Sequence, residues 1–492
     1  MLAELLQGVA LRNIIETGSL EIRGVTHDSR KVEKGFLFVA IPGYEIDGHQ
    51  FIPQAIQKGA VAVVVSQSPQ KDIKIPQLVV ENSRKALAHI ASRFFKNPSH
   101  QMRIVGITGT NGKTTVTYLL ESIFKAAGRN PGVIGTINAR FGGKIFQADN
   151  TTPESVDLQA LMAQMLESGV TDVIMEVSSH ALSLERIYEI EFDAAIFTNL
   201  SQDHLDYHKT MEDYFGAKKR LFSEYLPQSG KKGKFAVINM EDGFGEKILS
   251  DAGVRCVRAG LTGPYEIFCS SFQLSENGIQ AEIRIGSESL LIRSPLLGRF
   301  NLENILVAVG LAHGLKVSTE AIQKGIENLA CVPGRFEKIP NDRGVFVFVD
   351  FAHTPEALAR VGEHLRKLAR GRVITVFGCG GDRDRTKRPL MGREAGLFSD
   401  IVIVTSDNPR TEDPQSIINQ ITPGLEEIGF SQNKIMTIAD REKALQKAVE
   451  MLQRGDLLLV AGKGHEDYQI VGKKKTHFSD QEILKKLLSV AS

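Results

Sequence analysis

The sequence predicts an α/β protein that folds into three domains. A chain of 492 residues exceeds what one core usually encloses, since domains typically take about 100 to 200 residues. Short apolar runs of strand length alternate along the chain with stretches of helical periodicity, which is the order typical of parallel sheets. The 42% of apolar and 24% of charged residues are those of an ordinary globular protein.

Residues 1–100 are expected to form the first domain, a small α/β unit. Apolar runs at 35–41 and 60–66 stand between turn residues and predict buried strands. A helical stretch follows and closes at Asn97-Pro98, because proline cannot continue a helix. Glu4 stands where a signal peptide has basic residues, and no apolar run approaches the ~18 residues that a bilayer crossing needs.

Residues 101–333 are expected to form the central domain around a parallel sheet. A strand leads into a glycine loop and then into a helix, whose apolar residues recur every three or four positions from Val116 until Gly128 ends the pattern. Further apolar runs that predict strands of this sheet lie at 173–177, 194–197 and 235–239. A β-rich insertion, with alternating residues at 279–285, precedes another helix that begins near Asn301.

Residues 334–492 are expected to form a third α/β domain, because the pattern breaks around Cys331-Val332-Pro333-Gly334. Beyond this break, helical stretches separate four apolar runs at 345–349, 373–377, 401–404 and 457–461. The same order of elements as in the central domain predicts a second parallel sheet.

Charge and cysteine usage exclude several classes of protein. The formal net charge of +1 gives no support to general binding of nucleic acid or of a membrane surface. The four cysteines lack the spacing of a zinc site or of a disulfide framework. A reducing cytoplasm fits them best, and we expect a cytoplasmic protein with no membrane insertion.

The stretch GITGTNGKTT, residues 106–115, has the context of a phosphate-binding loop between a strand and a helix. Backbone N–H groups and the helix N-terminus would hold phosphates, Lys113 would pair with the β- and γ-phosphates, and Thr114 would offer its hydroxyl to Mg²⁺. Five residues rather than four separate Gly106 from Gly112, and no guanine-reading Asn-Lys-x-Asp follows, so ATP is the expected nucleotide. The alternative is a glycine-rich turn with a chance lysine.

A metal-binding carboxylate is expected at the end of a neighbouring strand, where Glu176 stands. His204 follows the next strand and could reach the same edge, although a lone histidine of this kind is more often a hydrogen-bonded loop residue. His204 and His208 have a zinc-like spacing, but no third ligand is evident. Lys218 is expected to lie on a solvated helical face. Its ammonium group would repel Mg²⁺, so elementary chemistry gives it no role.

Seven motifs in chain order resemble those of the Mur ligases of peptidoglycan synthesis. They are GTNGKTT, MEVSSHAL, TNLSQDHLDYH, YFGAKKRLF, LGRFNLEN, PGRFE and DFAHTPEAL, and they run from residue 109 to residue 358. The resemblance implies a first domain for the UDP end of the substrate, a central P-loop ATPase domain and a Rossmann-like C-terminal domain. It also implies an ATP-dependent ligase that adds the third residue of the peptide to UDP-N-acetylmuramoyl-L-alanyl-D-glutamate through an acyl phosphate, and a monomer is expected.

The resemblance assigns residues to the nucleotide, the metal and the UDP substrate. ATP is assigned to Gly109, Thr110, Asn111, Gly112, Lys113, Thr114, Thr115, Asn301, Arg335, Asp350 and His353. The UDP substrate is assigned to Ser29, Asn150, Thr151, Thr152, Ser178 and Arg186. Family members often have Gln two residues before that arginine, where this chain has Leu184. The lysine matching Lys218 is carbamylated by CO₂, which turns a cation into an oxygen ligand, so Thr114, Glu176, His204 and Lys218 would share Mg²⁺. Lys113, Glu176, His204 and Lys218 are the expected catalytic set.

The stretch Asp407-Asn408-Pro409-Arg410 follows the strand at 401–404 and could be a simple turn. By resemblance it accompanies meso-diaminopimelate as the added amino acid, together with Arg383, Gly462 and Glu466. Arg410 suits the distal carboxylate that distinguishes diaminopimelate from lysine, because its planar fork can bind both oxygens.

Four alternatives stay open. The same fold could add L-lysine, which Arg410 opposes, or D-Ala-D-Ala. It could lengthen folate, which the HDSR and DNTTP motifs disfavour. The chain could also be a non-catalytic, nucleotide-regulated binding protein that has kept only the fold.

Overall fold

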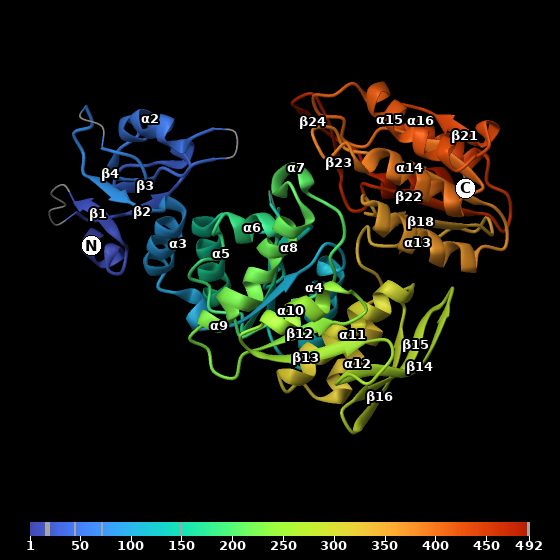
Figure 1. The fold of residues 1–492 in the computed structure, drawn as a ribbon, viewed down its shortest axis with the longest axis horizontal. Coiled ribbons are helices and arrows are strands. Elements are labelled where there is room, and N and C mark those ends of the chain that lie inside the picture. The colour runs from blue at the N-terminus through green and yellow to red at the C-terminus, as the bar shows by residue number, and fades with distance from the viewer. Residues whose placement is uncertain (15–19, 44–45, 70–71, 148–149, 490–492) are drawn as a thin grey trace.

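The computed structural model describes residues 1–14, 20–43, 46–69, 72–147 and 150–489. Asp149, the first residue of the DNTTP motif, lies outside these ranges. Figure 1 shows three bodies in chain order, with the green central one between the blue N-terminal body and the orange C-terminal one. Among the described residues, no helix combines the length and the apolar character that a bilayer crossing requires.

The N-terminal body is built on a sheet whose strand order is β1-β5-β4-β3-β2 among the described residues. The strands are β1 (Leu11–Ile14), β2 (Gly24–Thr26), β3 (Phe36–Val39), β4 (Ala60–Val65) and β5 (Gln77–Val80), and the helices are α1 (Leu2–Leu6), α2 (Ile52–Gln57) and α3 (Ser83–Phe94). The edge strand β1 runs antiparallel to β5, and the other pairs are parallel. Asn82 caps α3 by accepting from the N–H groups of Arg84 and Lys85, and Asn97 adopts a left-handed conformation beyond its end.

The central body has a sheet with the order β16-β15-β14-β13-β12-β11-β6-β10-β7-β8-β9 among the described residues. The strands are β6 (Arg103–Thr108), β7 (Pro131–Ile134), β8 (Asn138–Phe141), β9 (Lys144–Gln147), β10 (Asp172–Glu176), β11 (Ala194–Phe197), β12 (Phe235–Asn239), β13 (Arg255–Gly260), β14 (Ile267–Ser275), β15 (Gly278–Ile285) and β16 (Glu288–Ser294). The strands from β7 to β14 in this order pair in parallel, as predicted. The expected β-rich insertion is not a separate unit, because β15 and β16 extend the same sheet by antiparallel pairing.

Helices cover both faces of the central sheet. They are α4 (Lys113–Ala126), α5 (Ser155–Glu167), α6 (Ser179–Ser183), α7 (Leu205–His208), α8 (Met211–Arg220), α9 (Leu226–Gln228), α10 (Phe244–Asp251), α11 (Arg299–Gly314) and α12 (Thr319–Asn328). One core packs α4, α11 and α12 against the sheet, and a second core packs α5 and α8 against its other face. The predicted α4 stripe from Val116 to Phe124 is buried, and Gly128 has a φ of 72° just beyond the helix.

The C-terminal body has the strand order β17-β18-β22-β19-β20-β21, with a separate hairpin of β23 and β24, among the described residues. The strands are β17 (Glu337–Lys338), β18 (Phe346–Asp350), β19 (Val373–Phe377), β20 (Ile401–Val404), β21 (Ile435–Thr437), β22 (Leu457–Ala461), β23 (Tyr468–Val471) and β24 (Lys474–His477). The helices α13 (Pro355–Leu368), α14 (Lys387–Phe398) and α15 (Pro414–Glu427) share one core, and α16 (Arg441–Glu450) and α17 (Asp480–Leu488) share the other.

The predicted domain boundaries fall in the segments between these sheets. Residue 100 stands between β5 and β6, and residue 333 between β16 and β17. That the three units correspond to independent domains with these limits stays a prediction. All four cysteines are free thiols, in agreement with the absence of a disulfide framework.

Candidate active site

The loop between β6 and α4 needs glycine at two positions. Gly109 has a φ of 148°, and a Cβ there would lie 1.9 Å from Oγ1 of Thr198. Gly112 has a φ of 88°, and a Cβ there would lie 2.3 Å from Oδ1 of Asn304. Left-handed backbone and close packing therefore exclude a side chain at these two positions, which leaves room for phosphate at the helix N-terminus.

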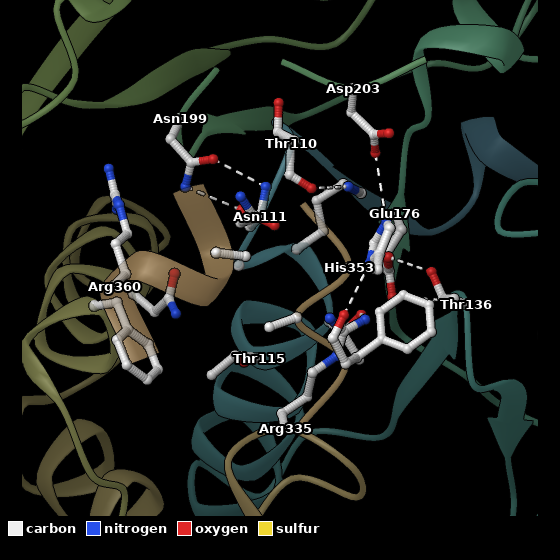
Figure 2. Close-up of a pocket in the computed structure, with 18 of the residues that line it drawn as sticks. Thr110, Asn111, Thr115, Thr136, Glu176, Asn199, Asp203, Arg335, His353 and Arg360 are labelled. Carbon is white, nitrogen blue, oxygen red and sulfur yellow. Dashed lines mark hydrogen bonds and ion pairs between the residues drawn. The ribbon is translucent and has the colours of Figure 1, made fainter. Parts of the chain in front are cut away.

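Asn199 fixes this loop from the end of the neighbouring strand β11. Its Oδ1 accepts from the N–H of Asn111 at 2.9 Å, its Nδ2 donates to the carbonyl of Asn111 at 3.1 Å, and its own carbonyl accepts from the N–H of Thr110 at 2.9 Å. Figure 2 shows the contacts of the Asn199 side chain with Asn111 beside the cavity. Sequence reasoning missed Asn199, although it lies in the TNLSQDHLDYH motif.

Two lysines converge on the carbonyl oxygen of Gly109. Nζ of Lys113 donates to it at 2.8 Å and to the carbonyl of Thr110 at 2.9 Å, and Nζ of Lys218 donates to it at 2.8 Å. Lys218 is 1% exposed, and its Nζ lies 4.5 Å from the ring centroid of Tyr214. Burial lowers the pKa of both lysines, and the charge of Lys113 lowers that of Lys218 further.

The expectation of a solvated face at Lys218 was therefore wrong. Helix α8 buries Tyr214, Ala217 and Lys218 against the phosphate loop. Its neighbour Lys219 points the other way and pairs with Asp251 at 2.7 Å. A lone basic residue on the buried face of a helix cannot be told from its solvated neighbours by charge alone.

Glu176 ends β10 beside the loop and is 1% exposed. Its carboxylate accepts from the N–H of Thr136 at 3.1 Å and from the hydroxyl of Thr136 at 2.8 Å. The hydroxyl of Thr151 lies 3.1 Å from that of Thr136, and the hydroxyl of Thr152 donates to the carbonyl of Glu176 at 2.8 Å. The predicted metal carboxylate and two predicted substrate residues are therefore neighbours.

The C-terminal body reaches the phosphate loop through Arg335. Its Nη2 donates to Oγ1 of Thr114 at 3.0 Å, and its guanidinium lies 4.5 Å from the ring centroid of Phe351. Asp350 holds the Arg335 segment, since its carboxylate accepts from the N–H groups of Phe336 at 2.6 Å and Ala352 at 2.7 Å. Burial raises the pKa of Asp350 and lowers that of Arg335.

Asp203 joins the two bodies on the other side of the cavity. Its carboxylate lies 3.4 Å from Nε2 of His204, 3.4 Å from Nε2 of His353 and 3.6 Å from Nζ of Lys387. Burial alone would raise the pKa of Asp203, but its contacts with His204, Lys387 and His353 hold it well below its usual range. Sequence reasoning missed Asp203, although it stands directly before His204.

One cavity brings together most of the predicted nucleotide and metal residues. Its lining includes Thr110, Asn111, Gly112, Lys113, Thr114, Thr115, Thr151, Glu176, Ser178, His204, Lys218, Asn301, Arg335, Asp350 and His353. Asn301 is held at its wall, where its Nδ2 donates to the carbonyl of Leu297 at 2.8 Å. A cavity with a phosphate loop, the basic side chains of Lys113, Lys218 and Arg335, and contributions from two bodies is suited to a nucleoside triphosphate.

Three family models match the chain in order. They are "Mur ligase family, catalytic domain" over residues 21–95, "Mur ligase middle domain" over 107–312 and "Mur ligase, glutamate ligase domain" over 334–464. A relative from Geobacter metallireducens named UDP-N-acetylmuramoyl-L-alanyl-D-glutamate--2,6-diaminopimelate ligase is 46% identical over 94% of this chain and 93% of its own. The chain belongs to the Mur ligase family.

Two further comparisons support this membership. A Geobacter sulfurreducens relative of the same name is 44% identical to this Mur ligase and covers 98% of this chain and 96% of its own. A solved structure bearing that name superposes with a TM-score of 0.68 at 32% identity and covers 96% of this chain and 97% of that one.

The residues predicted for the UDP substrate are only partly brought together in this Mur ligase. Ser178 caps α6 by accepting from the N–H of Ala181 at 3.1 Å, and Nε of Arg186 donates to Glu154 at 2.6 Å. Asn150 is exposed. Ser29 lies in the N-terminal body, where its hydroxyl donates to Oε1 of Gln54 at 2.7 Å, and it does not line the cavity. Leu184 is half-buried at the end of α6.

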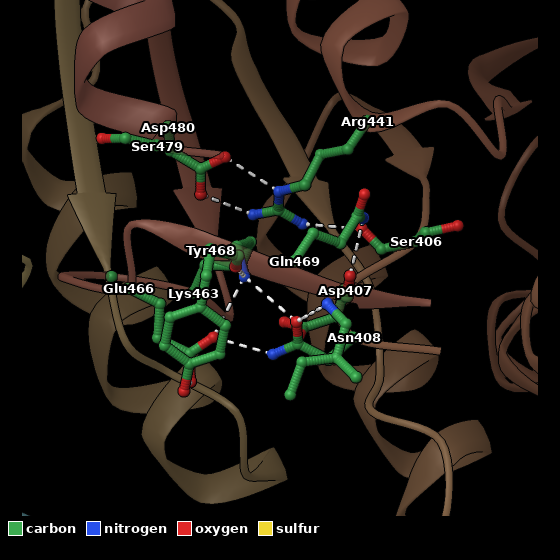
Figure 3. A network of polar contacts seen from close by, with 12 residues as sticks. Ser406, Asp407, Asn408, Arg441, Lys463, Glu466, Tyr468, Gln469, Ser479 and Asp480 are labelled. Carbon is green, nitrogen blue, oxygen red and sulfur yellow. Dashed lines mark hydrogen bonds and ion pairs between the residues drawn. The ribbon is translucent and has the colours of Figure 1, made fainter. Parts of the chain in front are cut away.

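The residues predicted for diaminopimelate gather on three loops of the C-terminal body and do not line the cavity. Nη1 of Arg410 donates to the carbonyl of Gly381 at 2.6 Å, next to Arg383. Nδ2 of Asn408 donates to Glu466 at 2.8 Å, as Figure 3 shows. A Cβ on Gly462 would lie 2.6 Å from the carboxylate of Asp407, and one on Gly381 would lie 1.9 Å from the carbonyl of Pro409, so the loops pack closely.

Sequence reasoning also missed Lys463, the fully buried centre of this network. Its Nζ donates to Glu466 at 3.0 Å and to Oδ1 of Asn408 at 3.4 Å. The carboxylate of Glu466 thus already has a cationic partner inside the protein. The loop AGKGHE gives no local signal that its lysine points inward.

Among the described residues, no three His, Cys, Asp or Glu side chains are grouped so as to hold a metal ion. His204 and His208 therefore have no third zinc ligand there. Thr114 and Glu176 offer buried oxygen atoms that suit Mg²⁺, but two lysine ammonium groups beside them oppose it. The donor set fits Mg²⁺ only if Lys218 becomes an anion and phosphate oxygens complete the site.

Proposed function

We propose that this Mur ligase uses ATP to join meso-2,6-diaminopimelate to the D-glutamate carboxylate of UDP-N-acetylmuramoyl-L-alanyl-D-glutamate, in peptidoglycan precursor synthesis. Relatives that bear this activity in their names are 44 to 46% identical over nearly the whole chain. The observation that carries the proposal is the convergence of Lys113, Lys218 and Glu176 on a phosphate loop that the C-terminal body closes through Arg335.

The phosphate loop explains the first step. The D-glutamate carboxylate attacks the γ-phosphorus of ATP, the bond to the β-phosphate oxygen breaks, and ADP leaves. Both reactants are anions, so cations must offset the charge that builds between them. Lys113 now donates to carbonyls of its own loop, and we infer that these bonds are exchanged for phosphate oxygens when ATP binds.

The second step is attack of an uncharged amine on the acyl phosphate. A tetrahedral intermediate forms, phosphate leaves, and an amide bond results. Water would hydrolyse the acyl phosphate, so the site must be covered during the reaction. The contacts of Arg335 with Thr114 and of Lys387 with Asp203 support a C-terminal body that covers the site.

We propose that Lys218 is carbamylated. Burial and the charge of Lys113 lower its pKa, which favours the free amine that reacts with CO₂ to give a carbamate and a proton. The product would place an anion beside Lys113 and remove the repulsion between the two ammonium groups. Thr114, Glu176, His204 and the carbamate would then hold Mg²⁺, which when bound neutralises charge on the phosphates.

The loops of the C-terminal body would select the amino acid. Arg410 is proposed to bind the distal carboxylate of diaminopimelate, with Arg383, Asp407, Asn408, Gly462 and Glu466 around the rest of it. A site built around such a partner rejects an analogue that lacks it by roughly 10⁴-fold. Lysine lacks this carboxylate, so we expect strong discrimination against it.

The UDP end would lie toward the N-terminal body, where Ser29 stands. Glu154 supports this placement, because its carboxylate pairs with Arg186 at 2.6 Å and with Arg84 of the N-terminal body at 3.3 Å. We propose a monomer, in keeping with a cavity whose described lining comes from the central and C-terminal bodies of one chain. We propose a cytoplasmic site of action because the reaction consumes ATP.

Product mass spectrometry tests this function directly. The chain is incubated with ATP, Mg²⁺, the UDP-dipeptide and either meso-diaminopimelate or L-lysine, and phosphate release is followed in parallel. We expect the diaminopimelate product with stoichiometric phosphate. Comparable incorporation of lysine would overturn the assigned amino acid, and an absence of substrate-dependent phosphate release would favour a nucleotide-regulated binding protein.

A further inference from the structure

An ion pair between a fully buried arginine and a half-buried glutamate lies beneath the loops that carry Arg383 and Arg410. Arg388, in the first turn of α14, is fully buried, and its Nη1 and Nη2 donate to the carboxylate of Glu412 at 3.0 and 2.9 Å. The same guanidinium donates to the carbonyl of Gly380 at 3.2 Å. Burying such a pair costs so much hydration that it is weak evidence for a role in stability, so its position beneath these loops needs another explanation.

Glu412 connects the two loops through its second set of contacts. Its Oε1 also accepts from the N–H of Asp382 at 2.7 Å, and the carboxylate of Asp382 in turn accepts from the hydroxyl of Thr411 at 2.7 Å. The N–H of Gly381 donates to the carbonyl of Asn408 at 2.9 Å. These side-chain and backbone hydrogen bonds thus join the loop at 378–386 to the segment at 405–413.

The joined loops hold two residues in left-handed conformations. Arg410 has a φ of 50° and Asp382 a φ of 52°, which residues other than glycine rarely adopt. The backbone of Arg410 is further fixed by β23 and the turn after it, since its N–H donates to the carbonyl of Ile470 at 3.1 Å and its carbonyl accepts from Gly472 at 2.7 Å. Strain of this kind persists only where surrounding contacts enforce it, and it tends to occur at ligand sites.

The guanidinium groups of Arg383 and Arg410 oppose the closeness of these loops, and the carboxylates of Asp407, Glu466 and Asp382 offset part of this effect at Arg410. Burial lowers the pKa of Arg410, and the neighbouring charge of Arg383 lowers it further. Two guanidinium groups on adjacent loops repel each other and would move apart if the loops were free. An incoming carboxylate would relieve the repulsion, but the site must be held together before the carboxylate arrives, because preorganisation reduces the cost of binding.

We propose that Arg388 and Glu412 are positioning residues that hold Arg383 and Arg410 together for the distal carboxylate of the added amino acid, and so set the preference for diaminopimelate over lysine. This inference rests on the proposed function. Neither residue needs to touch the substrate, since Arg388 is buried and Glu412 is occupied by Arg388 and the N–H of Asp382.

Glu412→Gln tests the proposal, because it keeps the shape of the side chain and removes the charge that pairs with Arg388. Misplacement of binding groups by about 1 Å can cost up to ~10²-fold, so we expect the KM for diaminopimelate to rise about 10- to 100-fold. The KM for ATP should stay within about twofold, since this change removes no contact with the nucleotide. The ratio of kcat/KM for diaminopimelate to that for lysine should fall.

Asp456→Asn is a matched control. Nη2 of Arg372 donates to Asp456 at 2.6 Å in an arginine–carboxylate pair at the opposite, amino-terminal ends of β19 and β22. This variant should lower the midpoint of thermal unfolding without a selective change in the KM for diaminopimelate. Wild-type protein that fails to add diaminopimelate would instead contradict the proposed function.

Two outcomes would overturn the inference while leaving the proposed function intact. One is a folded Glu412→Gln protein whose KM for diaminopimelate is unchanged, and the other is an equal rise in the KM values for diaminopimelate and ATP. If Glu412→Gln does not fold, Asp382→Gly replaces it, because Asp382 is exposed and this substitution removes both of its side-chain hydrogen bonds with Thr411. An unchanged KM for diaminopimelate in that variant would likewise overturn the inference.

Discussion

Single residues carry the chemistry, and Lys218 offers the sharpest prediction. Lys218→Ala should reduce the rate of phosphate release by at least about 10²-fold, because the proposed carbamate, with its oxygen ligand and its negative charge beside Lys113, could not form. A small carboxylic acid such as acetate or propionate should restore part of the activity by filling the space of the carbamate. The measurement is phosphate release at saturating ATP, with and without the acid.

Lys219→Ala is the control for that experiment, since Lys219 stands on the same helix and pairs with Asp251 away from the cavity. It should keep nearly full activity and show no response to added acid. An inactive Lys218→Ala protein that no small acid restores would argue that the ammonium group itself is required, and an active one would remove Lys218 from the site.

Arg410 is the second residue, and its loss should change the KM for one substrate and not for the other. Arg410→Ala should raise the KM for diaminopimelate by about 10²-fold, since truncating one partner of a buried charge pair typically costs ~2–5 kcal/mol. The KM for ATP should change little. Arg393→Ala, which removes an exposed arginine of α14, is the control. Equal effects on both substrates would assign Arg410 to folding of the loop.

At the scale of elements, local sequence was sufficient for most of the fold. Strands such as β12 and β19 match their predicted apolar runs at 235–239 and 373–377 residue for residue, because a fully buried parallel strand is apolar throughout. The neighbours that pack against a given strand or helix could not be predicted from its own residues. The joining of β15 and β16 to the central sheet and the burial of Lys218 depend on neighbours far away in sequence.

The candidate nucleotide site depends on the loop between β6 and α4. Gly109 of this loop can be compared with Gly128, which lies beyond the end of α4. Gly109→Ala should abolish ATP binding and lower the midpoint of thermal unfolding, because its Cβ would overlap Oγ1 of Thr198. Gly128→Ala places a Cβ in open space at a φ of 72° and should cost only about 1 kcal/mol of backbone strain. Nucleotide affinity measured by calorimetry should stay normal in Gly128→Ala and vanish in Gly109→Ala; equal affinities would show that the loop does not bind phosphate in this conformation.

At the scale of the whole molecule, the candidate site depends on contacts between bodies that no single motif reveals. Arg335 reaches Thr114 across 221 positions of sequence, and Asp203 meets His353 and Lys387 of the C-terminal body. The family resemblance named Arg335, Thr114 and His353 individually. Their pairing, and the part of Asp203, required coordinates because side-chain contacts between bodies leave no periodic pattern in sequence.

The contact between the N-terminal and central bodies predicts that the stability of the protein depends on pH. Nδ1 of His89, on α3, lies 2.9 Å from Glu189 of the central body, and this hydrogen bond raises the pKa of His89. A histidine with a raised folded pKa adds stability that is complete below its unfolded pKa of about 6.5 and is lost as the pH rises through the folded pKa. His89→Gln should therefore destabilise the protein by up to about 1 kcal/mol at low pH and by less at high pH, since the pair is partly exposed. Thermal unfolding of both proteins from about pH 5.5 to about pH 8.5 measures the difference, with the range set by the ordinary pKa of histidine.

His477→Gln is the control, because His477 pairs with Glu482 on the surface and makes no contact between bodies. A wild-type advantage over His89→Gln that grows with rising pH would mean that His89 is neutral in the fold and that the N-terminal body is held by other contacts.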